Sequence, residues 1–243
     1  LGVEDYGIYN VVGGLVAMFS FLNATMSGAT SRFITFELGK NSSKVQTVFS
    51  VALTIHIIIA LIVFLIGETF GLWFLENKLT IPATKMYEAK WLLQFSIVTM
   101  IFSFTQVPYN ASIIAHEKMN IYAYFELVNV GLKLLSVYLL LIIDANKLIF
   151  YGAIVMLTQI GVTLLYRLYC TRKWEHCKFN LSLDREFLRP LLSYSGWDLF
   201  GNASLVARTQ GVNVLLNIFF GAILNAAAGI AMQVQTAAMS FAT

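Results

Sequence analysis

Apolar residues in this chain gather in long blocks that are separated by short polar connectors. The blocks cover residues 7–31, 47–67, 91–114, 121–143, 148–169, 190–219 and 222–243. A run of about 20 apolar residues is long enough to cross a hydrocarbon core of roughly 30 Å as an α-helix. The strand-like alternation that a membrane barrel needs is missing. The pattern predicts an all-α, polytopic transmembrane helix bundle with six full spans and a seventh, incomplete one.

Two of these blocks contain residues that disturb a regular helix. Pro108 interrupts the third block, and a polar stretch interrupts the sixth. Proline removes a helical hydrogen bond and clashes with the preceding turn. We therefore expect a kink or local unwinding in both blocks.

The composition agrees with lipid as the solvent of this chain. Hydrophobic residues make up 58% of it and charged residues 12%, whereas a soluble domain is close to half apolar and about a quarter charged. The net charge of +3 comes mainly from Lys and Arg in the connectors, which is typical of membrane topology signals. The lipid bilayer is the expected partner, and nucleic acid is not.

The connectors also predict an orientation. The connectors after the first, third and fifth blocks contain more basic residues than the alternate connectors do. The basic residues near these three connectors are Arg32, Lys40, Lys44, Lys118, Arg167, Arg172, Lys173, Lys178, Arg185 and Arg189. Since cytoplasmic loops carry the excess of Lys and Arg, this side is predicted to be cytoplasmic. The longest polar connector, 171–188, is the boundary expected between two bundles.

The fourth block has one polar face. Tyr122, Glu126, Asn129 and Lys133 fall within an arc of about 60° on an ideal helix. A lone charge at mid-bilayer costs about 2.5–3.5 kcal/mol on insertion scales, so such residues usually face a bundle interior or an aqueous cavity. Two interpretations stay open: a buried pairing of Glu126 with Lys133, or a cavity-lining role in a substrate pathway.

The sixth block has a similar polar face. Its members are Ser195, Asp198, Asn202, Thr209 and Asn213. Asp198 and Arg208 lie ten residues apart, roughly 15 Å of helical rise, and therefore do not pair along a straight helix. Each needs a partner on another helix or a substrate pathway. Because arginine binds phosphate through bidentate hydrogen bonds, we hypothesise that Arg208 and Lys133 together neutralise a pyrophosphate head group.

The sequence contains few motifs that are typical of enzymes or cofactor sites. Neither catalysis nor a cofactor is expected. The three histidines are scattered, and no Gly-rich phosphate loop or G-x-S-x-G elbow occurs. Cys170 and Cys177 flank His176 without a second ligand pair, so no metal site is expected there.

Three stretches resemble bacterial polysaccharide flippases, of the O-antigen repeat-unit type, in the multidrug/oligosaccharidyl-lipid/polysaccharide exporter superfamily. They are LGVEDYGIYNVVGGLVAMFSFLNATMSGATSRFITFELGK, VPYNASIIAHEKMNIYAYFELVNVGLKLL and FFGAILNAAAGIAMQVQTAAMSF. The resemblance implies two six-helix lobes around a central cavity in the bacterial cytoplasmic membrane. It also implies export of undecaprenyl-pyrophosphate-linked oligosaccharides by alternating access.

On this resemblance, the chain is expected to be a fragment. It holds a six-helix lobe without its first helix in 1–170, an inter-lobe cytoplasmic loop in 171–188 and the start of a second lobe in 189–243. The expected substrate pathway contains residues of the two polar faces: Arg208, Lys133, Glu126, Asn129, Asp198 and Asn202.

Two other functions remain open. A cation-coupled multidrug exporter of the same superfamily can use Glu126 or Asp198 as a carboxylate switch, with Na⁺ or H⁺ as the coupling ion. A membrane-embedded glycan polymerase or transferase is less favoured, because it needs an acid/base cluster on a large aqueous loop and no connector exceeds about twenty residues.

Overall fold

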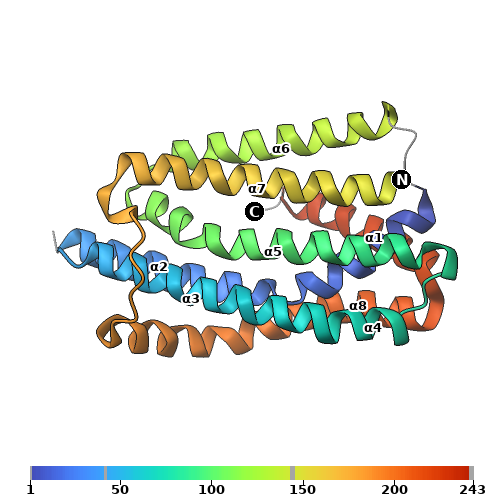
Figure 1. Cartoon of the computed structure of the whole chain (residues 1–243), viewed down its shortest axis with the longest axis horizontal. Coiled ribbons are helices and arrows are strands. Elements are labelled where there is room, and N and C mark those ends of the chain that lie inside the picture. The colour runs from blue at the N-terminus through green and yellow to red at the C-terminus, as the bar shows by residue number, and fades with distance from the viewer. Residues whose placement is uncertain (1, 41–42, 143–145, 241–243) are drawn as a thin grey trace.

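The computed structural model describes residues 2–40, 43–142 and 146–240 and folds them into a bundle of helices without strands (Figure 1). The prediction of an all-α bundle is confirmed. The α-helices are α1 Val3–Ala17, α2 Ser20–Gly39, α3 Val45–Ile66, α4 Leu72–Asn77, α5 Met86–Ala115, α6 Met119–Ile142, α7 Lys147–Lys173 and α8 Arg185–Ser240. Short turns add the π-helical η1 Gly67–Gly71 and the 3₁₀ turns η2 Ala83–Lys85 and η3 Glu175–Cys177.

Five helical segments in the described chain are long and apolar enough to cross a membrane. They are Val45–Asn77, Ala83–Ala115, Met119–Ile142, Lys147–Lys173 and Leu199–Ala238. The consecutive helices α1 and α2, which meet at a bend of 45°, pass the same test together and bring the number to six. The protein is therefore a multi-pass membrane protein.

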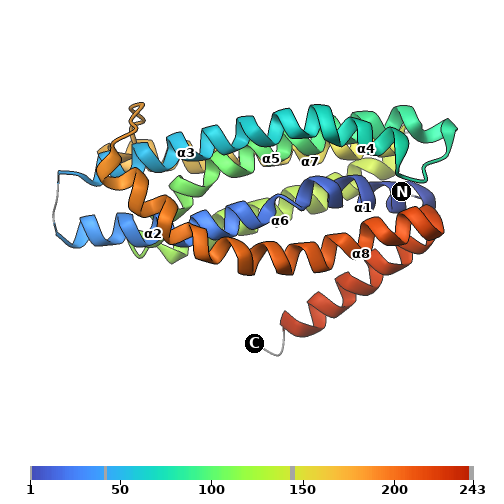
Figure 2. The ribbon, with the colours of Figure 1, turned by 90° about the horizontal axis from the view of Figure 1, so that it is seen from below.

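Helix α8 is a hairpin of two arms that reverse at Gly221. This residue has φ 78° and ψ −172°, a conformation that glycine adopts without steric cost. The first arm covers residues 185–220 and the second arm 222–240, which correspond to the sixth and seventh apolar blocks. Figure 2 shows the second arm, in dark red, folding back from the end of the bundle that lies near the N-terminus.

We expected a kink or local unwinding in two blocks, and local unwinding is not observed in either. Helix α5 remains helical through Pro108, and Ser112 Oγ donates a hydrogen bond of 3.0 Å to the Pro108 carbonyl oxygen. The sixth block is helical throughout its length as well. In lipid the backbone must satisfy its polar groups internally, and a nearby serine helps a helix to tolerate proline. The breaks lie elsewhere, between α1 and α2 and at Gly221.

The connectors rich in basic residues gather at one end of the bundle, on the left in Figure 1. There Lys44, before α3, forms a 2.6 Å ion pair with Glu186 of α8. The backbone N–H of Asn180 donates to Ser50 Oγ of α3 at 3.3 Å. These contacts join the α2–α3 connector to the start of α8 and the α7–α8 connector to α3, as expected of segments on one side of a membrane.

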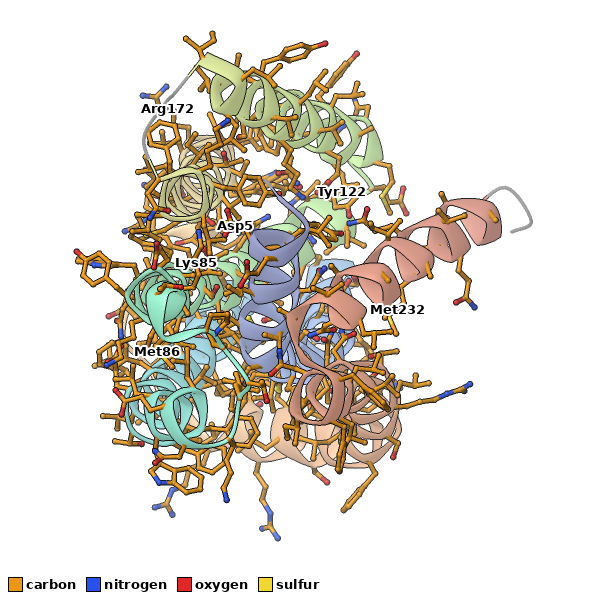
Figure 3. The ribbon with its side chains drawn as sticks, turned by 90° about the vertical axis from the view of Figure 1, so that its right-hand side faces the viewer. Asp5, Lys85, Met86, Tyr122, Arg172 and Met232 are labelled. Atoms are coloured by element: carbon orange, nitrogen blue, oxygen red, sulfur yellow. The ribbon has the colours of Figure 1, made fainter. Side chains whose placement is uncertain are left out.

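The opposite end is held by contacts of the α4–α5 connector and η2. Lys85 forms a 2.8 Å ion pair with Asp5 of α1, and Figure 3 shows the two side chains facing each other. The backbone N–H of Thr80 donates to Asn217 Oδ1 of the first arm at 3.0 Å. Both α1 and α8 are thus anchored to the same connector.

Candidate binding site between α1 and α8

The polar face predicted on α6 is only partly buried. Glu126 and Asn129 are half-buried, and Asn129 Nδ2 donates to Glu126 Oε2 at 3.4 Å. Lys133 is exposed, and it makes no ion pair with Glu126 in the described structure. The helical spacing therefore brings Glu126 and Asn129 together, while the expected buried pairing of Glu126 with Lys133 does not form.

The residues predicted on α8 have three different surroundings. Asn202 Nδ2 donates to Thr25 Oγ1 of α2 at 3.1 Å, which links the first arm to α2. Arg208 is exposed, and the side chain of Asp198 lies outside the described residues. Since α6 and the first arm occupy opposite sides of the bundle in Figure 1, Arg208 and Lys133 are not brought together.

A different polar cluster lies where α1 packs against both arms of α8. We call it the amide seam, and it consists of Asn10, Gln210, Asn213, Asn217, Asn225 and Gln233. The spacing of four residues between Asn213 and Asn217 places both on one face of the first arm. The seam is neutral, because all six side chains are carboxamides.

Close packing at glycines brings α1 against the hairpin. Gly7 lies so close to the carbonyl group of Ala222 that no Cβ would fit between them. Gly229 is similarly close to the side chain of Asn10, and a Cβ on Gly14 would lie 2.8 Å from Gln210 Oε1. Such small-residue contacts are typical of helix pairs in membranes.

The amides at the centre of the seam are deeply buried. Asn217 and Asn225 are 0% exposed and Asn213 is 8% exposed. Asn213 Nδ2 donates to Gln210 Oε1 at 3.1 Å, while Asn217 Oδ1 accepts the N–H of Thr80. Each of these bonds uses one polar atom of an asparagine and leaves the other without a partner.

Several buried amide atoms of the seam have no hydrogen-bond partner in the described structure. They are Asn10 Nδ2, Asn213 Oδ1, Asn217 Nδ2, Asn225 Nδ2 and Asn225 Oδ1. An unpaired buried polar group costs about 1–3 kcal/mol. The unpaired set contains both donors and acceptors and carries no charge. It therefore suits a neutral ligand whose groups both donate and accept hydrogen bonds.

A hollow of about 530 Å³ opens beside two of these asparagines, Asn10 and Asn213. It is lined by Asn10, Asn213, Gly229, Met232, Gln233, Thr236 and Ala237. At its edge, Gln233 Nε2 donates to the hydroxyl of Tyr6 at 2.7 Å. The volume lies within the range of roughly 300–1,000 Å³ that is usual for small-molecule sites.

Of the seam, only Asn213 belonged to a polar face predicted from the sequence. The other five residues were missed because they carry no charge and come from three helical segments: Asn10, Gln210, Asn217, Asn225 and Gln233. The repeat of asparagine at 213, 217 and 225, on either side of Gly221 in an otherwise apolar stretch, is the signal that marks them.

In the part of the chain that is described, His, Cys, Asp and Glu side chains do not form an alternative, metal-binding site. No group of three or more His, Cys, Asp or Glu side chains there could hold a metal ion. No protein-family model matches the chain, and comparisons with curated proteins and with solved structures give no match. The amide seam is therefore the candidate site of this protein.

Proposed function

We propose that this protein is a flippase for lipid-linked oligosaccharides. It moves undecaprenyl-pyrophosphate-linked repeat units across the bacterial cytoplasmic membrane by alternating access, without catalysing a reaction. The observation that carries the proposal is the pair of unpaired, buried amide atoms, Asn10 Nδ2 and Asn213 Oδ1, on residues that line the 530 Å³ hollow. Sugar hydroxyl groups both donate and accept hydrogen bonds, so they can pair with the donors and the acceptors of the seam.

Arg208 is the cation that the proposal assigns to the pyrophosphate. It lies five residues before Asn213 on the first arm, about 7.5 Å along the helix axis. Its guanidinium is exposed and free to form bidentate hydrogen bonds with phosphate oxygens. Lys133 is on α6, which lies on the opposite side of the bundle from the first arm, and the proposal gives it no part in this contact.

Export measured in cells tests the proposal. The gene is deleted in its host, and the distribution of lipid-linked repeat units between the two leaflets is measured after complementation. We expect Asn213→Leu to reduce export by about tenfold, the effect of losing one good hydrogen bond to the cargo. Asn77→Leu is the control, because Asn77 is exposed at the end of α4 and bonds only to its own helix.

Normal export by Asn213→Leu at wild-type protein level would contradict the proposal. Repeat units that are distributed normally in the deletion strain itself would also contradict it. Stranding of repeat units on the cytoplasmic leaflet supports it.

A cation-coupled multidrug exporter is the second candidate. It is favoured by Glu126, a half-buried carboxylate in a spanning helix that accepts a hydrogen bond from Asn129. Such a carboxylate can bind H⁺ or Na⁺ during transport. This function predicts that deletion changes sensitivity to cationic dyes while surface glycan stays normal, and that Glu126→Gln reproduces the change.

A further inference from the structure

A second hollow lies on the other side of the contact between α1 and the first arm. We call it the apolar cavity. Its volume is about 610 Å³, and every residue that lines it is apolar or glycine. The lining comes from α1 to α5, with η1, and from the first arm. Water needs two to four polar partners to occupy a buried site, and this lining offers no polar side chain.

Small residues on the first arm give the apolar cavity an elongated shape. Ala203, Ala207 and Gly211 line it at intervals of four residues, and Leu215 continues the row. The row extends over about 18 Å along the helix axis. A Cβ added to Gly211 would meet no atom within 4 Å, so this glycine faces open space. The apolar cavity therefore runs along the first arm.

The apolar cavity and the amide seam share two helices. On the first arm, Gln210 belongs to the seam and the next residue, Gly211, lines the apolar cavity. On α1, Gly14 packs against Gln210 while Leu15 lines the apolar cavity. The amide seam and the apolar cavity therefore adjoin the same pair of helices.

We propose that the apolar cavity binds the long hydrocarbon tail of the molecule whose polar head occupies the amide seam. This inference rests on the proposed function and names the site of the isoprenoid chain. The cavity lies within membrane-spanning segments, where the surrounding solvent is hydrocarbon. Its apolar lining matches a chain that carries no polar group, and its length follows the axis along which a lipid tail lies.

Photolabelling of the whole purified chain in lipid nanodiscs tests this inference. The probe is a polyprenyl pyrophosphate with a diazirine near the end of the tail and no sugar. We expect labelled peptides from the first arm and from the segment that contains η1. Gly211→Leu fills the cavity without a backbone clash and should reduce this labelling by about tenfold.

Gly201→Leu is the matched control on the same arm. Gly201 is exposed, does not line the apolar cavity and has open space around its Cβ position. Both changes replace a helical glycine and should improve helix propensity equally. Labelling should therefore stay at the wild-type level in Gly201→Leu.

Competition separates the possible occupants. Displacement of the probe by a lipid-linked saccharide, but not by the same excess of phosphatidylglycerol, supports the inference. Equal displacement by phosphatidylglycerol would overturn it and assign the cavity to bulk acyl chains. Labelling that Gly211→Leu leaves unchanged would overturn it too, while the export assay still decides the proposed function. Tail labelling in the cavity together with normal export in the deletion strain would support a hydrocarbon-binding site in the cavity. It would contradict the proposal that the cargo is a lipid-linked oligosaccharide.

Discussion

Two clusters of polar side chains inside the bundle differ in how completely they are hydrogen-bonded. Between α5 and α7, Gln159 Nε2 donates to Gln106 Oε1 at 2.8 Å, and Thr163 Oγ1 donates to the same oxygen at 3.2 Å. None of these three side chains has an unpaired buried atom. The amide seam leaves five buried atoms unpaired. A satisfied cluster stabilises its helix pair, whereas an unsatisfied cluster costs free energy until a ligand binds.

The largest effect is expected where α1 meets the hairpin. Gly7→Ala places a methyl group against the backbone carbonyl of Ala222, which cannot move without displacing the second arm. We expect a loss of about 1–3 kcal/mol in the free energy of unfolding. The contacts of the amide seam should be lost, while the hydrogen bonds of the α5–α7 cluster should remain. Unfolding in SDS titrations measures this.

Gly13→Ala is the control for the same helix. No atom lies within 4 Å of a Cβ added to Gly13, and alanine favours the helix by about 1 kcal/mol. This variant should be as stable as the wild type or more stable. Equal stability of Gly7→Ala and Gly13→Ala would show that α1 does not depend on close contact with the hairpin.

Leucine substitutions in the two polar clusters should change the free energy of unfolding differently. Gln159→Leu removes two hydrogen bonds and should lower the free energy of unfolding by about 1 kcal/mol. Asn225→Leu removes two unpaired buried atoms and should leave stability unchanged or raise it. The same SDS titrations compare the variants. A large loss of stability in Asn225→Leu would mean that Asn225 is a structural residue.

A smaller effect separates the two candidate cations. Arg208→Gln should reduce export by about three- to tenfold, because it removes a charge-assisted contact to phosphate on the arm that carries the seam. Lys133→Gln should stay within about twofold of wild type, as is usual for an exposed charge. Leaflet assays at matched protein levels measure both. Equal losses in the two variants would favour a passage that spans the whole bundle.

The sequence predicted the elements of this fold because each depends on local information. Runs of apolar residues predicted the membrane helices, and the 100° spacing of α6 predicted one polar face for Glu126 and Asn129, which hydrogen-bond to each other in the structure. The ends of the helices extend beyond the apolar blocks, as in α3 and α4, where the helical span includes Glu68 and reaches Asn77. Hydropathy ends a block at the first charge, whereas lipid favours a helix that continues.

The candidate site could not be predicted in the same way because it depends on tertiary contacts. The amide seam forms only after Gly221 reverses the chain and α1 packs against two arms that follow it by about 200 residues in the sequence. Arg208 and Lys133 were predicted as site residues because they are charged. The charge of a residue does not indicate which side of the bundle its helix will occupy. An amide can be recognised as unpaired only when its burial and its hydrogen-bond partners are known.

The smallest expected effect lies far from both clusters, at the end of the bundle rich in basic residues. His116, just beyond α5, packs on Trp174 with ring centroids 4.1 Å apart and on His176 at 5.1 Å. Burial lowers the pKa of His116, and the charges of His176 and Lys118 lower it further. The unfolded chain, with a pKa near 6.5, therefore takes up the proton first as the pH falls.

Stability should consequently decrease as the pH falls below about 6.5, until the folded histidine is protonated as well. His116→Phe keeps an aromatic ring on Trp174 and removes the titrating group, so its melting temperature should fall less between pH 7 and pH 5. Equal acid sensitivity in His116→Phe would show that another group causes the loss. Since the amide seam and the α5–α7 cluster contain no ionisable side chain among the residues named for them, the stability difference between Asn225→Leu and Gln159→Leu should be the same at both pH values.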